Sequence, residues 1–225
     1  MTILACSYCR GSLSRSGPVC WGAMRIIAGT LRSRPLQAPP GLATRPTSDR
    51  LRETLFNVLS PRLDGAHFLD LYAGSGAVGI EALSRGAQRA VFVEHAAGAL
   101  KILRANLARL GLQSGFEIDS GTVAGYLRKE IRTPGFDIVF LDPPYDAADQ
   151  YHATLGLLGG LLGGLVGGKV RGLLRAGAVV IAEHRRKEVL AESYGQLRRS
   201  RLLRQGDAAL SFYAANEPQI QEHGG

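Results

Sequence analysis

Short apolar runs alternate with helix-like stretches along the chain from about residue 66 onward. AHFLDLY, RAVFVE, FDIVFLD and GAVVIAEH have the length and composition of buried strands. The intervening AVGIEALSRG and AGALKILRANLARLG place apolar residues at helical spacing, and each ends at a glycine, Gly86 or Gly111. This alternation predicts βαβ units and therefore an α/β fold, with a mostly parallel sheet covered by helices on both faces.

Two further patterns complete the predicted fold. The strand-like pieces near residues 199–204 and 208–214 are joined by too few residues for a crossover helix, so we expect them to pair antiparallel. Ahead of the sheet, TSDRLRETLFNVLS begins with capping residues and places Leu51, Leu55 and Leu59 on one face, which predicts an amphipathic helix.

The domain organisation follows from where these patterns stop. Residues 1–23 show no sustained period and are expected to form a disordered leader, with Met24 as a candidate true start. Residues 24–215 are expected to form a single domain whose first part, 24–62, is a basic extension, and residues 216–225 a tail. A Leu/Gly-rich insertion at 156–169 is compatible with a helix or with a flexible linker, because glycine weakens each helical turn.

The net charge of +8 changes this picture because it is concentrated in the first quarter of the chain. Residues 1–62 hold nine arginines, no lysine and two acids, a net charge of +7. A second basic patch covers residues 183–187 and 198–204. Guanidinium groups match phosphate bidentately, so the charge favours a nucleic acid as partner.

Several classes of protein are disfavoured. Cys6 and Cys9 have C-x-x-C spacing, but no second pair or nearby histidine completes a zinc set. GGLVGGKV resembles a phosphate-binding loop, yet Val170 stands where serine or threonine must hold magnesium. No stretch approaches the length of a membrane span and the start lacks a signal-peptide core, so a cytoplasmic protein is expected.

The segment FLDLYAGSGAVG leaves a strand, turns on glycines and enters a helix. Such a loop lets a ligand approach the backbone and the free N–H groups of the helix N-terminus. Glu94 ends the next strand, where a carboxylate can accept hydrogen bonds from both ribose hydroxyls. Gly74, Gly76 and Gly79 also fit the dinucleotide fingerprint. However, Asp70 would repel a pyrophosphate and attract an ammonium group, which favours S-adenosylmethionine over NAD.

The stretch DPPY, residues 142–145, follows another predicted strand. The exocyclic amine of a base is a weak nucleophile because its lone pair is delocalised into the ring. The Asp142 carboxylate and the Pro143 carbonyl can accept hydrogen bonds from this amine and so localise its lone pair. Pro144 stiffens the turn, and Tyr145 offers a flat face for a flipped base. The sequence therefore predicts a methyltransferase that acts on a base amine.

With these motifs in place, the chain resembles the Class I methyltransferases, and MRIIAGTLRSRPL, RPTSDRLRETLFNVLS, EALSRGA and DAALSFY are similar to the RsmD family of 16S rRNA guanine-N2 methyltransferases. The resemblance runs from Met24 to about Tyr213. It implies a Rossmann-like, seven-stranded sheet with one antiparallel strand. It also implies methyl transfer from S-adenosylmethionine to N2 of guanine 966 of 16S rRNA, in the small ribosomal subunit or its assembly intermediate, by a monomer.

The resemblance also implies site residues. The cofactor site would comprise Asp70, Tyr72, Ala73, Gly74, Ser75, Gly76, Glu94, His95, Asp119, Arg45 and Thr47. The position near the adenine ring is either Asp119 or Thr122. The target amine would be held by Asp142, Pro143, Pro144 and Tyr145. The RNA-binding side would include Arg25, Arg32, Arg34, Arg50, Arg185 and Arg186.

Three other functions remain open at this point. The same tetrad serves adenine N6 methylation in DNA or rRNA. An inactive RNA-binding assembly factor could retain the fold, although intact Asp70, Glu94 and Asp142 argue against lost activity. An NAD-linked oxidoreductase would lack any recognisable hydride-transfer group.

Overall fold

The computed structural model describes residues 24–38, 49–129, 135–144, 148–162, 165–166, 169–170 and 173–215. The helices are α1 (Asp49–Leu59), the short 3-10 helix η1 (Ser60–Arg62), α2 (Ala77–Ser84), α3 (Ala97–Arg109), α4 (Val123–Arg128) and α5 (Ala148–Leu162). The strands are β1 (His67–Leu71), β2 (Arg89–Val93), β3 (Phe116–Asp119), β4 (Phe136–Leu141), β5 (Leu165–Val166), β6 (Lys169–Val170), β7 (Leu174–Arg185), β8 (Ser193–Tyr194), β9 (Leu197–Gln205) and β10 (Ala208–Ala215).

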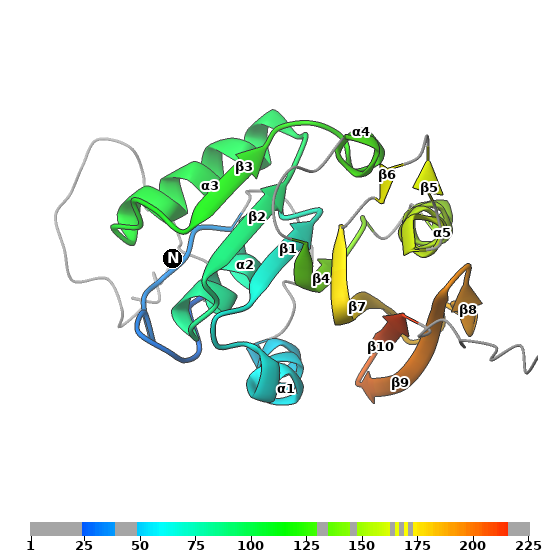
Figure 1. Cartoon of the computed structure of the whole chain (residues 1–225). Coiled ribbons are helices and arrows are strands. Elements are labelled where there is room, and N and C mark those ends of the chain that lie inside the picture. The colour runs from blue at the N-terminus through cyan, green and yellow to red at the C-terminus, as the bar shows by residue number, and fades with distance from the viewer. Residues whose placement is uncertain are drawn as a thin grey trace, which may run out of the picture.

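Eight of the strands form one twisted sheet in the order β3-β2-β1-β4-β7-β10-β9-β8 (Figure 1). The first five strands pair in parallel, whereas β10 pairs antiparallel with both β7 and β9. The predicted sheet and its antiparallel last pair are confirmed. The eighth strand is the two-residue β8, which pairs with the start of β9 and was not predicted.

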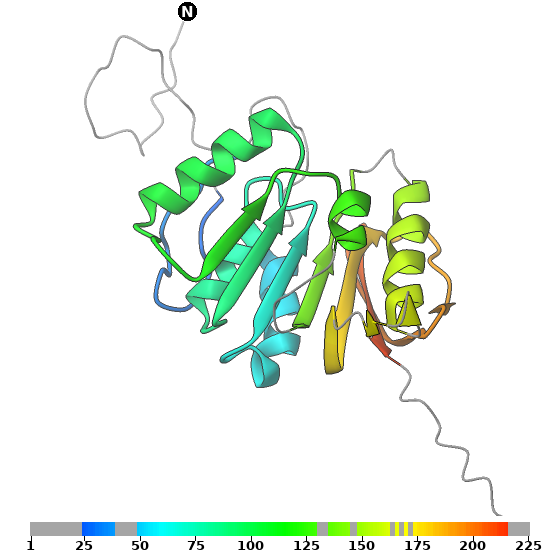
Figure 2. The same ribbon diagram turned by 45° about the horizontal axis from the view of Figure 1, so that its top comes forward.

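Helices cover both faces of the sheet, and each face has its own apolar core. One core lies beneath α1, α2 and α3 and contains Phe68, Phe92, Phe140 and Ile181. The other lies beneath α4 and α5 and contains the residues that alternate with these on the same strands, such as Leu141. Figure 2 shows α4 and α5 beside each other on their face of the sheet. Because side chains alternate along a strand, a residue at a strand end lies on the same face as the residue two positions before it.

The basic segment 24–38 is held against α2 by hydrogen bonds to side chains of that helix. The buried carboxylate of Glu81 accepts from the backbone N–H groups of Ile27 and Ala28 at 2.8 and 2.9 Å. Ser84, the last residue of α2, accepts from the N–H of Leu31 at 3.0 Å. The two ends of this segment meet in an isolated antiparallel bridge between Arg25 and Pro35. The leader 1–23 and the tail 216–225 lie outside the described residues.

The first part of the Leu/Gly repeat is a helix rather than a linker, because α5 continues to Leu162. Gly159 of α5 lies against β8, where a Cβ atom would come within 1.7 Å of the carbonyl oxygen of Tyr194. The glycine therefore allows a backbone-to-backbone contact that any side chain would prevent. Beyond α5, the short strands β5 and β6 follow instead of the helix that a phosphate-binding loop requires, which agrees with its exclusion.

Candidate active site

Four acids line one edge of the sheet, and we call them the acidic row: Glu94, Asp70, Asp142 and Glu183. They lie near the carboxyl ends of the neighbouring strands β2, β1, β4 and β7. Asp70 pairs in register with Phe92 and Phe140, which come two residues before Glu94 and Asp142. All four follow the alternation of the core beneath α1, α2 and α3. The carboxyl edge of a parallel sheet is where ligands of such folds bind.

Asp70 is fully buried and contributes to the N-terminal turn of α2. Its Oδ2 accepts a hydrogen bond from the N–H of Gly79 at 2.9 Å. Burial raises the pKa of Asp70 to about 7; the Gly79 hydrogen bond opposes this shift, and the negative charge of Glu94 adds to it. A cation that approaches the Asp70 carboxyl group would stabilise its ionised form.

The glycine loop between β1 and α2 is held in a single shape by its own backbone and by neighbouring elements. Gly76 has a φ of 79°, and a Cβ atom there would lie 2.3 Å from a methyl carbon of Leu103. Tyr72 also has a positive φ, and its hydroxyl lies 2.7 Å from that of Thr154 in α5. Strain of this kind is concentrated at functional sites. The Tyr72 hydroxyl thus braces the loop against α5.

Two other predicted loop residues make backbone contacts that fix the turn. Ala73 donates its N–H to the carbonyl of Val93 at 3.0 Å, which ties the loop to β2. The carbonyl of Ser75 accepts from the side-chain amide of Asn106 at 2.9 Å. The predicted residues Tyr72 to Gly76 therefore form one rigid turn above the carboxyl ends of β1 and β2.

Glu94 reaches across to this turn from the end of β2. One carboxylate oxygen accepts from the N–H of Gly74 at 2.9 Å, and the other accepts from the N–H of Ala96 at 2.7 Å. His95 is exposed, with its Nδ1 3.8 Å from Glu94. The structure thus joins Glu94 and Gly74, which the sequence predicted to serve one ligand.

The two candidates for the adenine position have local partners. Asp119, at the end of β3, accepts from the N–H of Gly121 at 2.8 Å and forms an ion pair with Lys129. The Thr122 hydroxyl caps α4 by accepting from Gly125 at 3.1 Å. Both lie at the carboxyl edge beside Glu94, whose N–H donates to the carbonyl of Asp119 at 3.0 Å. The choice between them stays a prediction.

Asp142 follows directly after β4, with Pro143 buried and Pro144 exposed. Burial raises the pKa of Asp142 well above its usual range, and the charges of Glu183 and then Asp70 raise it further. The predicted residues Tyr145, Arg45 and Thr47 lie outside the described residues. The described part of the tetrad therefore stands in the middle of the acidic row.

The six arginines predicted to bind RNA fall on two edges of the molecule. Arg25 lies near the carboxyl edge, where its guanidinium is 3.4 Å from Asp49 at the start of α1, and Arg50 is exposed on the same helix. Arg185 and Arg186 are exposed at the end of β7, directly beyond Glu183. Arg32 and Arg34 instead lie near the ends of α2 and α3, at the amino edge of the sheet. Arg34, for example, donates to the carbonyl of Arg109 at 3.4 Å.

Sequence reasoning missed Arg52, Glu183 and Asn106, all of them buried. A readable signal existed for each. Arg52 continues the buried stripe of α1, Asn106 falls between Leu103 and Leu107 on α3, and IAE repeats the pattern of an apolar strand that ends in an acid.

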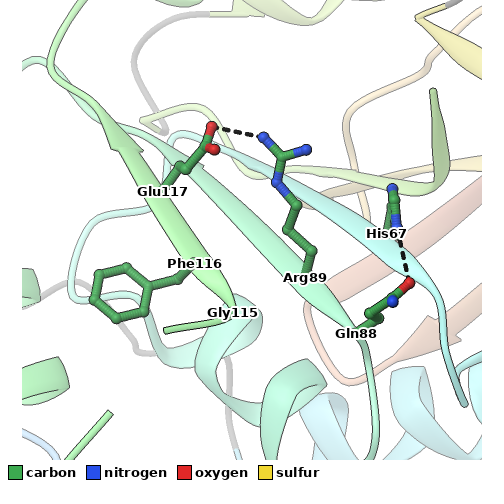
Figure 3. Close-up of a pocket in the computed structure, with 6 residues that line it drawn as sticks. All are labelled: His67, Gln88, Arg89, Gly115, Phe116 and Glu117. Carbon is green, nitrogen blue, oxygen red and sulfur yellow. Dashed lines mark hydrogen bonds and ion pairs between the residues drawn. The ribbon is translucent and has the colours of Figure 1, made fainter. Parts of the chain in front are cut away.

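The opposite, amino edge of the sheet holds a shallow pocket whose charges are paired (Figure 3). Arg89 forms an ion pair with Glu117 at 2.6 Å, and His67 lies 3.0 Å from Gln88. The one acid among the described residues that line this pocket, Glu117, is paired with Arg89, so the pocket does not resemble the acidic row. In the part of the chain that the structure describes, no cluster of His, Cys, Asp and Glu suits a metal ion. Among the same residues, no helix has the length and apolar character needed to cross a membrane.

Comparison with known proteins agrees with the geometry. Residues 24–214 match the family described as Conserved hypothetical protein 95. The chain is 35% identical over 191 residues to "Putative rRNA methyltransferase YlbH" of Bacillus subtilis, covering 84% of this chain and 98% of that protein. It is 44% identical over 124 residues to "Ribosomal RNA small subunit methyltransferase D" of Escherichia coli, covering 55% of this chain and 61% of that protein.

A solved structure gives the same result. "Putative methyltransferase yhhF from Escherichia coli" superimposes with a TM-score of 0.71 at 31% identity, covering 85% of this chain and 97% of that one. The fold and site therefore define a Class I methyltransferase. The chain belongs to the RsmD family of S-adenosylmethionine-dependent methyltransferases.

The residues present suit this cofactor. A close turn at Gly76 has no room for a side chain, a buried Asp70 would be stabilised by a cation, and Glu94 presents its carboxylate at the same turn. S-adenosylmethionine carries an ammonium, a sulfonium and a ribose diol, and no phosphate.

Proposed function

We propose that this protein transfers the methyl group of S-adenosylmethionine to the N2 amine of a guanine in small-subunit rRNA. The observation that carries the proposal is the acidic row, which places Asp142 beside Asp70 and Glu94 on one face of the carboxyl edge. Relatives named rRNA methyltransferases, among them one that acts on the small subunit by name, support the choice of RNA.

The cofactor half of the site comprises the glycine loop, Asp70 and Glu94. S-adenosylmethionine supplies an electrophilic methyl group on a sulfonium sulfur. Asp70 lies beneath the loop and stabilises the positive charge of the methionine end. Glu94 accepts hydrogen bonds from the ribose hydroxyls, in exchange for one or both of its bonds to Gly74 and Ala96. Arg45 and Thr47 complete this half by folding over the cofactor.

The base half of the site comprises DPPY. Asp142 and the carbonyl of Pro143 accept hydrogen bonds from the two protons of the amine, which draws the lone pair out of the ring and toward the methyl group. Because burial of Asp142 favours its protonated form, an amine proton that it accepts is held firmly. Tyr145 stacks against the flipped base.

The RNA backbone would be held by cations around this edge. Arg25 and Arg50 flank it on the α1 side, and Arg185 and Arg186 flank it on the β7 side. These side chains can neutralise phosphates on both sides of an extruded guanine. We propose a monomer that acts in the cytoplasm on the small subunit or its assembly intermediate.

The test is a transfer assay with labelled S-adenosylmethionine. Small subunits would come from cells that lack this enzyme, and the rRNA would be digested to nucleosides. Label in N2-methylguanosine supports the proposal. Label in N6-methyladenosine would keep the chemistry and overturn the base, and bound cofactor without any transferred label would indicate an RNA-binding factor. The Asp142→Ala variant serves as the negative control for methyl transfer.

A further inference from the structure

Glu183 lies beside Asp142 at the end of the next strand. Leu141 of β4 and Ala182 of β7 are the last residues that pair between these strands, so Asp142 and Glu183 are the next residues along each. Phe140 and Ile181 both belong to the core beneath α1. Alternation therefore directs the two carboxyl groups toward the same face, and Glu183 is only 2% exposed.

Arg52 of α1 is a buried cation on which Glu183 acts electrostatically. Its guanidinium is fully buried beneath α1, where Nη2 donates to the carbonyl of Arg25 at 2.7 Å and to Asp49 at 2.8 Å. Its Nε and Nη1 have no hydrogen-bond partner among the described residues. Burial lowers the pKa of Arg52, while the charges of Glu81, Asp49 and Glu183 raise it. The structure therefore places a buried cation within electrostatic reach of Glu183.

We propose that Glu183 is a positioning residue of the methyl-transfer site, which accepts a hydrogen bond from Asp142 once Asp142 has taken the proton that the target amine releases. This inference rests on the proposed function. In the step, the amine nitrogen uses its lone pair to bond the methyl carbon, and the carbon–sulfur bond breaks with its electrons left on sulfur. One N–H proton passes to Asp142, so atoms and charge balance without another reactant.

The groups that face Glu183 define what this pair feels. Glu183 acts on Asp142 in the sheet, as Asp70 does, and on Arg52 of α1. Asp49 of α1 and Glu81 and Arg85 of α2 act on Arg52 in turn. On β10 the residue in register with Glu183 is Leu210. His184 belongs to the other face, where its Nε2 lies 2.9 Å from the Ser211 hydroxyl. When both acids are ionised they repel each other, and a proton taken up by Asp142 removes this repulsion. Glu183 therefore makes Asp142 a stronger base.

The test compares Glu183→Gln, which keeps the shape and removes the charge, with Glu117→Gln, which removes an acid at the amino edge. One readout is the carboxyl titration of Asp142 followed by carbon NMR in cofactor-free protein, with Asp142→Ala used for assignment. The other is the single-turnover transfer rate against pH. In Glu183→Gln we expect Asp142 to titrate at least one pH unit lower, with the acid limb of the rate profile moving likewise. The plateau rate should fall about 10- to 100-fold, the range expected when a general base is no longer held in position.

Each outcome of these measurements either supports or overturns the role of Glu183. Glu183→Asp keeps the charge on a shorter side chain and should recover most of the titration and rate, which a purely structural role would not require. If Glu183→Gln does not fold, Glu183→Ala takes its place, and its Asp142 titration must move in the same direction. An unchanged Asp142 titration in folded Glu183→Gln or Glu183→Ala overturns the inference. If wild type transfers no methyl group, the proposed function fails instead, and the NMR titration still shows whether the pair exists.

Discussion

The face of the sheet beneath α1, α2 and α3 buries charged side chains, whereas the described part of the face beneath α4 and α5 buries none. The first contains the buried Arg52, Glu81, Asp70, Glu94 and Glu183 and the half-buried Asp142. The second contains only neutral or weakly basic buried polar groups among the described residues, His67, Thr154, His184 and Ser211. Both faces carry a continuous apolar core, so the charges are not required for packing. Burial, and then the neighbouring charges, raise the pKa of Asp70 and Asp142, so these acids oppose folding near neutral pH, which is typical of a functional site.

The charged face is most directly tested at Asp142. Asp142→Ala removes the acceptor for the target amine, and we expect the single-turnover transfer rate to fall roughly 100- to 1,000-fold, as when one preorganised group is lost. Labelled transfer to small subunits measures the rate. A variant that retains more than a third of the wild-type rate would show that Asp142 does not act on the amine.

The apolar face is tested by two glycines of α5 that differ only in their neighbours. Gly159→Ala forces a Cβ atom against the carbonyl of Tyr194, and we expect a loss of about 2–3 kcal/mol of unfolding free energy. Gly156 has nothing within 4 Å of its Cβ position, so Gly156→Ala should gain roughly 0.5–1 kcal/mol through helix propensity. Urea unfolding measures both. Equal effects of the two substitutions would contradict the close contact between α5 and β8.

The rim of the charged face is tested with matched pairs of arginines. Arg186 and Arg204 are exposed near the carboxyl edge, whereas Arg198 and Arg201 are exposed farther from it on β9. We expect the double variant Arg186→Gln with Arg204→Gln to bind RNA with a smaller salt dependence. The slope of the logarithm of the binding constant against the logarithm of salt concentration should fall by about two, roughly one for each phosphate that is no longer neutralised. Arg198→Gln with Arg201→Gln should leave it nearly unchanged. The same reduction in both pairs would mean that binding follows net charge rather than position.

The smallest effect concerns stability against pH. The pKa of Asp70 is about 7 in the folded protein against an ordinary value of 3.8, so the stability it provides below pH 3.8 is lost as pH rises to about 7. Asp70→Asn keeps an acceptor for Gly79 and removes this loss. At pH 8 and without cofactor, we expect it to be about 1–2 kcal/mol more stable than wild type, with little difference at pH 4. Thermal unfolding at both pH values checks this, and an equal difference at both would refute the assignment.

The sequence predicted helices α1 to α4 and the long strands of the sheet, and it placed Asp70, Glu94 and Asp142 in or directly after three of them, because each apolar run marks a strand. It could not predict the burial of Arg52, since arginine is normally exposed and its burial depends on acids from α2 and β7. The helical state of the Leu/Gly repeat depends on a contact between Gly159 and Tyr194, which no local pattern contains. The placement of Arg32 and Arg34 depends on how the 24–38 segment runs along α2 to the amino edge.

We propose that the acidic row is divided between a cofactor half and a base half. Calorimetric titration of S-adenosylmethionine into wild type, Glu94→Ala and Asp142→Ala tests this division most directly. The loss of hydrogen bonds to a charged acceptor predicts about a 10- to 100-fold weaker dissociation constant for Glu94→Ala. Asp142→Ala should bind within about threefold of wild type, since its partner is the base. Equal affinity of wild type and Glu94→Ala, or a lost affinity in Asp142→Ala, would contradict the division.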